Sequence, residues 1–400
     1  MKILLVTGNF TAPGVNPWLL DDLAAALADA GHDVDVIVHS PTAPRPRGLS
    51  QGASPRIRIL SVGATTQPSS AIAKLRFYLA TAVRLHTTGA RFAAASVYDL
   101  AIYPSIAAFS FGFPSRMRRK GIARRLLFVM WDFFPIHQME IGRIKPAAIA
   151  PALKAIERLA IRRADTIAVM SPANERFLAA YHRGLAARIV HIPPWAATST
   201  AGAPPVEANP NGGFTAVFGG QLVKGRGVDT LLDAAHELER RGVPAKIVIA
   251  GAGTDAASLH AKSKELGLRS VEFVGSLPRD EYRALLRRSQ AGIAVTVAGV
   301  TPPSFPSKII EYCASGLPVI ACVEQSSDAG SYLERHGVGV SVSAGDHMAL
   351  ADAIAELVDE HVSGTLAARG ERARELFLAE LSADRAADAI VRTVTPEETA

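Results

Sequence analysis

The stretch FPSKIIEYCASGLPVIA, residues 305–321, carries the strongest structural signal in this chain. Ser307 is typical of a helix cap, and Gly316 followed by Pro318 is typical of a helix end. The apolar run after them predicts a buried strand. Glu311 lies one turn beyond Ser307, so both side chains can face one cavity, where a carboxylate near a strand end can accept hydrogen bonds from ribose hydroxyls. The alternative is a solvent-facing glutamate on an ordinary helix.

Short apolar runs alternate with helical patterns on both sides of this stretch, which is typical of parallel sheets with crossover helices. Strands are expected at 3–7, 34–39, 100–103, 126–130, 166–170, 188–192, 215–218, 246–250, 271–274, 291–297 and 319–322, and helices at 19–30, 228–241, 348–359 and from 368 onward. Residues 198–213 interrupt the alternation with a Pro-, Gly- and Ala-rich segment, which predicts a linker. The chain is therefore expected to form two α/β domains whose ligands bind at the carboxyl ends of the strands.

A second informative stretch is FGGQLVKGRGVDTLL, residues 218–232. A strand is expected to end in Gly219 and Gly220, and a helix follows a loop that carries Lys224 and Arg226. Glycines let backbone amides approach an anion, and a helix start adds its positive dipole end. Two cations add charge-assisted hydrogen bonds to phosphate. The pattern indicates a diphosphate site, although many strand-to-helix turns contain glycine.

Gly251 and Gly253 form a second glycine turn, after the strand expected at 246–250. The turn is consistent with close approach of the backbone to a ligand. Tight strand-to-helix turns need glycine for their own geometry as well, so both interpretations stay open.

A further cluster of polar residues lies in MWDFFPIHQMEIG, residues 130–142, at the exit of an expected strand. Asp132, His137 and Glu140 are set among aromatic residues there. A lone histidine beside aromatic residues is more often packed than catalytic. Three ionisable groups within nine residues favour a functional site.

The composition is that of a globular protein, with 48% apolar and 20% charged residues in a chain of 400. That length suits two domains of about 200 residues each. Two cysteines are too few for a disulfide framework and favour a reducing compartment. No signal core and no uncharged apolar run of about 20 residues is present. We expect a cytoplasmic protein, soluble or peripheral at the inner face of the cell membrane.

Charge is unevenly distributed along the chain. Residues 1–195 hold 24 Lys or Arg against 11 Asp or Glu, a net charge of +13, and the remainder holds 19 against 26, a net charge of −7. The densest basic cluster comprises Arg116, Arg118, Arg119, Lys120, Arg124 and Arg125. Aromatic residues for base stacking are absent from it, which argues against nucleic acid. Anionic lipid headgroups are the better partner, and a merely solvated basic face is the alternative.

Three sequence patterns would indicate a different chemistry. One of them is present but has another explanation, and the other two are absent. Asp33-Val34-Asp35 matches the Asp-x-Asp pattern of metal-dependent sugar transferases, but it begins an expected strand, where the aspartates more plausibly flank a buried Val34. No phosphate-binding loop ending in Gly-Lys-Ser/Thr is present. The N-terminal GNFTAPG does not give the Gly-x-Gly-x-x-Gly dinucleotide fingerprint, which counts against a dehydrogenase.

Taken together, these segments resemble retaining glycosyltransferases of family 4, which have the two-domain GT-B fold. The resemblance covers most of the chain and includes GHDVDVI, AVMSPANERFL with Ser171, HIPPWA, FGGQLVKGRGVDTLL, IAGAGT, VEFVGSL and FPSKIIEYCASGLPVIA. The start Pro-Ser-Lys of the last segment is similar to the branch that builds bacterial surface polysaccharides and lipid-linked oligosaccharides.

The resemblance implies roles for particular residues. The residues that it places at the donor are Gly219, Gly220, Gln221, Arg226, Gly251, Gly253, Ser307, Lys308 and Glu311, with Glu311 on the ribose. The family usually has an Arg and then a Lys five residues later; here Gln221 and Arg226 occupy these positions, and Lys224 or Lys308 is the substitute cation. The first Glu of the usual Glu-x7-Glu motif, which orients the transferred sugar, is Pro303, and backbone groups at 304–307 are expected to replace it. The family's N-domain His aligns with Trp131, which leaves Asp132 or His137 nearest the acceptor.

The resemblance also implies a domain plan. It predicts an acceptor-binding domain at 1–197, a linker at 198–213, a nucleotide-sugar-binding domain at 214–375 and a helix at 376–400 that returns to the N-domain. The expected reaction moves a hexose or N-acetylhexosamine from a nucleotide diphosphate sugar, UDP rather than GDP, to a lipid-linked or polysaccharide acceptor. No metal or other cofactor is expected. A nucleotide-sugar epimerase and a non-catalytic nucleotide-sugar-binding protein are the alternatives.

Overall fold

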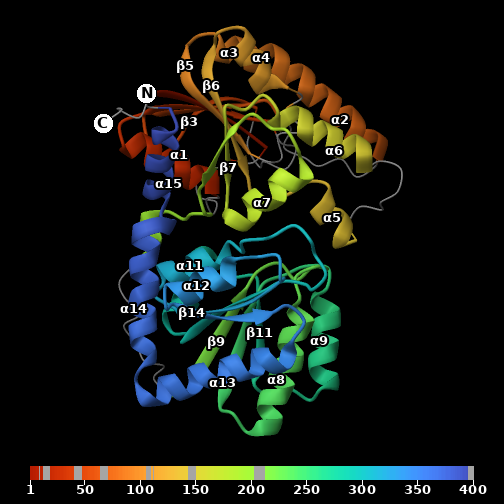
Figure 1. The fold of residues 1–400 in the computed structure, drawn as a ribbon, viewed down its shortest axis with the longest axis vertical. Helices are drawn as coiled ribbons and strands as arrows, with labels where there is room; N and C mark the ends of the chain where they lie inside the picture. Colours follow the sequence, from red (N-terminus) through yellow and green to blue (C-terminus); the bar gives the residue numbers. More distant parts are fainter. Residues whose placement is uncertain are drawn as a thin grey trace. The chain divides into compact units, whose positions relative to one another are not determined.

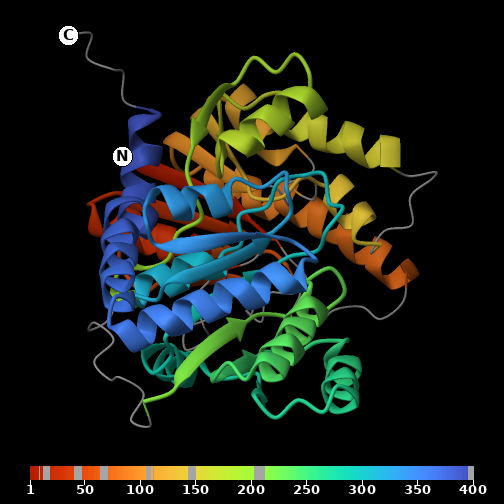
Figure 2. The same ribbon diagram turned by 60° about the horizontal axis from the view of Figure 1, so that its bottom comes forward.

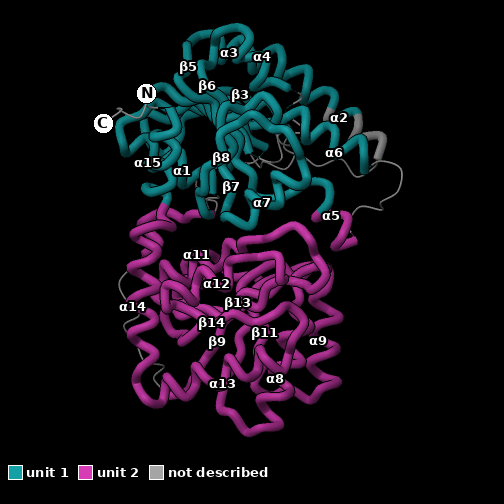
Figure 3. Tube along the Cα trace, in the orientation of Figure 1, with its two compact units in different colours: residues 1–136, 144–193, 383–400 teal, residues 137–143, 194–382 magenta. Residues whose placement is uncertain are grey.

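The structure is a computed structural model that describes residues 1–8, 10–11, 19–39, 47–63, 71–104, 110, 112–142, 150–201 and 212–394. The chain divides into two compact units, coloured in Figure 3. Unit 1 comprises Met1–Ile136, Ile144–Pro193 and Ala383–Ala400, and unit 2 comprises His137–Arg143 and Pro194–Ser382. Most of the expected linker, 202–211, lies outside the described residues. The segment 137–143 belongs to unit 2, whereas the sequence prediction had assigned it to the N-terminal domain.

Unit 1 is built on an eight-stranded sheet of order β3-β4-β2-β1-β5-β6-β7-β8. All of its neighbouring strands are parallel except β3, which pairs antiparallel with β4. The strands are β1 (Lys2–Thr7), β2 (Asp33–Val38), β3 (Gly48–Gln51), β4 (Ile57–Ser61), β5 (Tyr98–Pro104), β6 (Ala123–Met130), β7 (Thr166–Val169) and β8 (Arg188–His191). Strands such as β1 are apolar on both faces because helices cover both sides of a parallel sheet.

The helices of unit 1 connect these strands as crossovers (Figure 1). They are α1 (Leu19–Asp29), α2 (Ala71–Arg84), the π-helical turn η1 (Leu85–Gly89), α3 (Ala90–Ala93), α4 (Phe113–Arg119), α6 (Ala150–Ile161) and α7 (Pro172–Tyr181). Ser171 caps α7, and its hydroxyl accepts the Asn174 N–H. The last helix of the chain, α15 (Ala383–Arg392), also belongs to unit 1 and packs against α1.

Unit 2 is built on a six-stranded parallel sheet of order β11-β10-β9-β12-β13-β14. The strands are β9 (Phe214–Gly219), β10 (Ala245–Ala250), β11 (Val271–Gly275), β12 (Ala291–Val295), β13 (Val319–Val323) and β14 (Gly339–Ser343). The strand order reverses between β9 and β12. In open parallel sheets such a reversal opens a crevice at the carboxyl ends of the two strands, where ligands bind.

The helical segments of unit 2 connect its strands and follow them to the end of the unit. They are α5 (Ile136–Glu140, shared with unit 1 at its first residue), the 3-10 turn η3 (Thr198–Thr200), α8 (Val228–Arg241), α9 (Ala256–Glu265), α10 (Arg279–Arg287), α11 (Lys308–Ala314), α12 (Ala329–Arg335), α13 (His347–Ser363), α14 (Leu366–Leu376) and the π-helical turn η4 (Phe377–Leu381). Figure 2 shows α13 lying along the sheet, where it packs against α8 and against β9, β10, β13 and β14.

The helix α8 has the bounds expected from the sequence, 228–241, because glycines fix both of its ends. Gly227 before it and Gly242 after it adopt left-handed conformations, with φ of 67° and 72°. Its apolar side, including Leu231 and Leu238, is buried in the core of unit 2. Charged residues such as Asp229 and Arg240 are exposed on the other side, which is the amphipathic pattern of a surface helix.

None of the helices in the described part of the chain combines the length and the apolar composition that a membrane span requires. Cys313 and Cys322 are both buried free thiols. Burial raises the pKa of the Cys313 thiol to about 12 and that of Cys322 to about 11, so neither supplies a thiolate nucleophile near neutral pH.

Candidate active site

The donor-binding residues predicted from the sequence gather at one edge of unit 2, around the reversal point between β9 and β12. Gly219 and Gly220 end β9, and Gly251 follows β10 in the sheet. Thr296 follows β12, and Glu324 follows β13. All of these positions are at carboxyl ends of parallel strands, so they lie along the same edge.

Two tyrosines, the fully buried Tyr312 and the half-buried Tyr282, fix the start of the glycine loop. The Gly219 N–H donates to Tyr312 Oη at 3.0 Å, and that hydroxyl donates to the Ile293 carbonyl at 3.2 Å. A Cβ placed on Gly219 would lie 2.0 Å from Tyr282 Oη, so only glycine fits there. Burial raises the pKa of both Tyr282 and Tyr312 far above its ordinary value, so both phenols are neutral. Sequence analysis missed both tyrosines because helix periodicity predicts only that they face inward.

The glycines of the two strand-to-helix turns pack backbone against backbone. A Cβ on Gly251 would lie 1.8 Å from the Gly220 carbonyl oxygen, and one on Gly253 would lie 2.1 Å from the Leu222 carbonyl oxygen. The Gly220 N–H donates to the Ala250 carbonyl at 3.0 Å. The Gly220 amide therefore joins the two turns and the Gly219 amide is held by Tyr312, so neither N–H points to a phosphate in the way that the sequence pattern indicates. The second glycine turn fits the structural interpretation of Gly251 and Gly253.

The loop between β9 and α8 carries the polar groups that reach solvent. Gln221, Lys224 and Arg226 are all exposed, and Gly227 directly precedes the first turn of α8. Gly227 packs tightly against the exit of β12, because a Cβ there would lie 2.2 Å from the carbonyl oxygen of Thr296. The loop thus presents two cations beside a helix start, an arrangement that attracts phosphate oxygens.

Helix α11 presents Lys308 and Glu311 on its outer side, while Ile309, Ile310, Tyr312, Cys313 and Ala314 are buried. Lys308 Nζ lies 2.5 Å from Glu311 Oε2 and 4.8 Å from the centre of the Tyr282 ring. Tyr282 therefore contacts Lys308 of the ion pair through its ring and Gly219 of the glycine loop through its hydroxyl oxygen. The predicted cap is wrong in one respect: Ser307 stands at the cap position, but its exposed side chain makes no capping hydrogen bond.

The loop that precedes α11 is held by a carboxylate that sequence analysis missed. Pro303, at the position of the family's first Glu, is buried. Glu324, only 3% exposed, accepts the Ser304 N–H and the Thr296 hydroxyl, each at 2.6 Å. Glu324 follows a buried strand and belongs to no recognisable sequence motif. Only the order of the strands in the sheet shows that Glu324 faces the loop before α11.

In unit 1, Asp132 lies at the exit of β6 and is exposed. In the turn that follows Asp132, the Phe134 N–H donates a hydrogen bond to Glu157 Oε1 at 2.9 Å. Glu157 also contacts His182 Nε2 at 2.7 Å, and both side chains are buried. Burial raises the pKa of the Glu157 carboxyl above its ordinary value, although the hydrogen bond from His182 opposes the shift.

The segment 137–143 places its polar groups in unit 2. Glu140 accepts the Thr301 N–H at 2.7 Å and the Thr301 hydroxyl at 2.5 Å. Ile141 packs on Gly225, where a Cβ would lie 2.9 Å from the Ile141 Cβ. His137 is half-buried, and its Nδ1 has no hydrogen-bond partner among the described residues. Asp132 and His137 thus belong to different units, although the sequence grouped them in one site.

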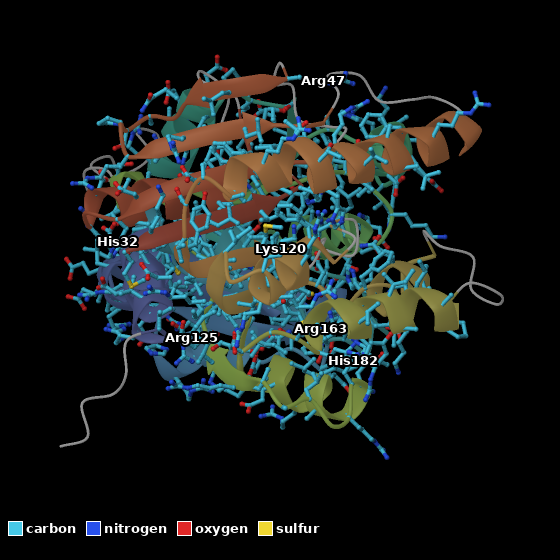
Figure 4. The ribbon with its side chains drawn as sticks, turned by 90° about the horizontal axis from the view of Figure 1, so that it is seen from above. His32, Arg47, Lys120, Arg125, Arg163 and His182 are labelled. Atoms are coloured by element: carbon cyan, nitrogen blue, oxygen red, sulfur yellow. The ribbon has the colours of Figure 1, made fainter. Side chains whose placement is uncertain are left out.

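The basic cluster of unit 1 lies at the opposite edge of its sheet from Asp132. Arg124 and Arg125 stand at the amino end of β6, and the end of α4 carries Arg116, Arg118 and Arg119. Half of the six cations are engaged internally: Arg116 with the His86 carbonyl at 2.7 Å, Arg118 with Asp165, and Arg124 with Asp99 at 3.0 Å. Figure 4 looks onto this edge and labels Lys120 and Arg125 together with Arg163. The cluster therefore does not contribute to the strand-exit site where an acceptor was expected to bind.

Both aspartates of the Asp-x-Asp sequence form ion pairs with arginine side chains. Asp35 is buried and accepts two hydrogen bonds from Arg58, at 2.7 and 2.6 Å, and one from the Tyr98 hydroxyl at 2.7 Å. Asp33 is paired with Arg56 at 2.9 Å. Within the part of the chain that the structure describes, no group of three or more His, Cys, Asp or Glu side chains is placed to hold a metal ion.

Two family models match the chain, and together they span most of it. The "Glycosyl transferase 4-like domain" matches residues 19–195, and "Glycosyl transferases group 1" matches residues 203–376. The D-rhamnosyltransferase WbpZ of Pseudomonas aeruginosa is 33% identical over 124 residues, which are 30% of this chain and 29% of that protein. A GDP-mannose-dependent alpha-(1-6)-phosphatidylinositol monomannoside mannosyltransferase of Mycobacterium tuberculosis is 30% identical over 148 residues, 36% of this chain and 38% of that protein. The chain thus matches well under two thirds of the length of either relative.

Solved structures of similar fold cover nearly the whole chain. Sucrose-phosphate synthase from Thermosynechococcus elongatus superposes with a TM-score of 0.73 at 18% identity, covering 98% of both chains. The Anabaena protein HepE, solved in complex with UDP and glucose, superposes with a TM-score of 0.66 at 16% identity, again over 98% of both. At such identities the likeness establishes the fold, and the family models establish the activity class. The chain is a glycosyltransferase with the two Rossmann-type domains of the GT-B fold.

Proposed function

We propose that this chain is a retaining glycosyltransferase of family 4, which moves a hexose or N-acetylhexosamine from a nucleotide diphosphate sugar to a lipid-linked or polysaccharide acceptor in cell-surface glycan synthesis. The observation that carries the proposal is the grouping of Arg226, the start of α8 and the Lys308–Glu311 pair around the strand-order reversal of unit 2. This grouping combines cations for a diphosphate with a carboxylate for a ribose. The similarity to a phosphatidylinositol monomannoside mannosyltransferase, and to the fold of WaaG, a glycosyltransferase involved in lipopolysaccharide biosynthesis, supports the choice of acceptor.

The proposed mechanism rests on fixed protein charges. A nucleotide diphosphate gains negative charge as its bond to the sugar breaks, and preorganised donors at that position lower the barrier. Arg226, Lys308 and the amides of the first turn of α8 are the groups assigned to this charge. Glu311 is assigned to the ribose hydroxyls. The sugar is attacked by the acceptor on the face that the diphosphate leaves, so no protein nucleophile and no metal ion take part in the proposal.

A thermal-shift screen tests the donor site. We propose a UDP-sugar rather than a GDP-sugar, in line with the UDP complexes of a similar fold, and the GDP-mannose dependence of one relative requires both classes in the screen. One nucleotide class should stabilise the protein equally with and without EDTA, and Glu311→Ala should abolish most of the shift. Glu334→Ala is the matched control, because Glu334 accepts a backbone N–H on β14. Loss of stabilisation on adding EDTA would refute the metal-free mechanism.

The acceptor is assigned to unit 1, at the exit of β6. Asp132 is exposed there and is the candidate to accept a proton from the acceptor hydroxyl. His137 is the second candidate, from the segment 137–143. Asp132→Asn should leave nucleotide-sugar binding unchanged and slow transfer, which isothermal titration and a transfer assay separate. Weaker donor binding in this variant would contradict the assignment.

We propose, in addition, that the enzyme works in the cytoplasm and docks on the inner face of the cell membrane. The support is the basic edge of unit 1, where Arg119, Lys120 and Arg125 are exposed and have no ion-pair partner among the described residues. Each such cation contributes about 1 kcal/mol near an anionic surface. Replacing these three by Gln should weaken cosedimentation with phosphatidylglycerol vesicles, while the same replacements of the paired Arg118 and Arg124 should weaken it less. Equal vesicle binding by wild type and the triple variant would refute the docking.

A further inference from the structure

The loop at 296–304 lies between β12 and α11 and lacks the carboxylate that the family resemblance assigns to position 303. Pro303 carries neither an N–H nor a charge. The expected substitute is the backbone at 304–307, and an irregular backbone segment binds a ligand precisely only when its own geometry is fixed.

Three side chains from one four-residue segment fix that geometry. The segment Glu324-Gln325-Ser326-Ser327 directly follows β13. Glu324 accepts the Ser304 N–H and the Thr296 hydroxyl, each at 2.6 Å. The Ser327 hydroxyl donates to the Ser304 carbonyl at 2.6 Å, and the Ser326 hydroxyl donates to the Val300 carbonyl at 3.2 Å. Both backbone groups of Ser304 are thus held by side chains of the neighbouring strand exit.

The arrangement also reaches the diphosphate loop. The Glu324 N–H donates back to Thr296 Oγ1 at 3.1 Å, which closes a reciprocal pair between the exits of β12 and β13. The Thr296 carbonyl in turn packs on Gly227, directly beside Arg226. Glu324 thus holds Ser304 directly and reaches the loop proposed to hold phosphate only through the Thr296 backbone, so the backbone before α11 depends on this carboxylate more than the phosphate loop does.

We propose that Glu324 is a positioning residue for the donor sugar: through Ser304 and Thr296 it sets the backbone at 304–307, which takes the place of the missing carboxylate at 303. The inference rests on the proposed function of unit 2 as the nucleotide-sugar site. Glu324 itself does not touch the donor, because it is buried and its carboxylate is occupied by the two hydrogen bonds.

The proposal predicts that loss of Glu324 affects the binding of two ligands differently. Glu324 serves the sugar moiety, so its loss should weaken binding of a nucleotide diphosphate sugar while the matching nucleotide diphosphate binds as before. A general structural role would weaken both ligands together. Glu324→Gln keeps an oxygen for the Ser304 N–H but offers no acceptor to the Thr296 hydroxyl, so its effect should lie between wild type and Glu324→Ala.

The test is isothermal titration of the full chain with UDP-glucose, UDP-N-acetylglucosamine and GDP-mannose, and with UDP and GDP. For the sugar nucleotide that binds wild type, Glu324→Ala should weaken affinity about tenfold, which is the effect of losing one or two hydrogen bonds, and should change affinity for the nucleotide diphosphate less than about twofold. Glu334→Ala should change neither. Ser327→Ala and Thr296→Val are milder variants that keep the test valid if Glu324→Ala does not fold, and each should weaken sugar-nucleotide affinity alone.

Two results would overturn the inference. Equal loss of affinity for both ligand types, or unchanged affinity for the sugar nucleotide in Glu324→Ala, would show that Glu324 does not position the sugar site, while the proposed function would stand. Failure of wild type to bind any of the five ligands would overturn the proposed function and this inference with it.

Discussion

Replacing Tyr312 by Phe removes one oxygen atom from the base of the candidate site. Its hydroxyl accepts the Gly219 N–H at 3.0 Å and donates to the Ile293 carbonyl at 3.2 Å, and the ring is fully buried. A net hydrogen bond is worth about 1 kcal/mol, and a buried N–H left unsatisfied costs about 1–3 kcal/mol more. We therefore expect Tyr312→Phe to lower the local free energy of opening at Gly219 by about 2–4 kcal/mol.

Hydrogen exchange followed by mass spectrometry measures this effect directly. Exchange in a peptide covering 214–222 should become about 30-fold faster or more, which corresponds to the lower end of that range. Affinity for the nucleotide donor should fall as well, because Gly219 begins the loop assigned to the diphosphate. Tyr332→Phe is the control: its half-buried hydroxyl donates to Glu380 at 2.7 Å, where water can replace either partner, so the cost should stay below about 1 kcal/mol. Unchanged exchange at 214–222 in Tyr312→Phe would refute the assignment of this amide to the phenol.

Two further changes test the packing and the electrostatics. Gly251→Ala places a methyl group 1.8 Å from the Gly220 carbonyl oxygen and should destabilise the protein by about 3 kcal/mol in urea unfolding, whereas a value below about 1 kcal/mol would show that the two turns are not in contact. His39 is fully buried, and burial lowers the pKa of its imidazole to about 4, below the unfolded value of 6.5. Between these values only the unfolded chain takes up the proton, so stability is present above pH 6.5 and falls toward pH 4, by about 2 kcal/mol between pH 7 and pH 5. His39→Gln should remove that part of the pH dependence, measured as the difference in unfolding midpoints from wild type, and an identical pH dependence in the variant would disprove it.

The fold was predictable where a local pattern and the tertiary environment agree. Strands such as β9 and β13 are apolar on both faces because helices cover both sides of their sheet, so each appears in the sequence as a short continuous apolar run. The helix α8 is bracketed by two left-handed glycines, and its ends follow from them. The strand β3 lacks such a signal, since all of its residues are exposed at the edge of unit 1, and the sequence prediction omitted it.

The polar framework of the site was less predictable, because it depends on which strands are neighbours. Tyr312 meets Gly219 across 93 positions of sequence, and Glu324 meets Thr296 across 28. The same limit applies to the basic cluster. Its density in the sequence suggested one charged face, but the strand order brings Asp99 and Asp165 beside Arg124 and Arg118 and neutralises part of it. Motif spacing predicts which residues share a helix or a loop, and strand order decides which of them meet.

The pairing of Lys308 with Glu311 bears on what the proposed site would select. The two side chains are 34% and 33% exposed, so their ion pair contributes little stability and is easily exchanged for other partners. A ligand with phosphate alone would draw Lys308 away and leave the Glu311 carboxylate without its cation. A ligand with a ribose alone would occupy Glu311 and leave Lys308 without its anion. A nucleoside diphosphate offers phosphate oxygens to Lys308 and ribose hydroxyls to Glu311 at once, and for that reason this pair favours the complete ribose diphosphate over either of its parts.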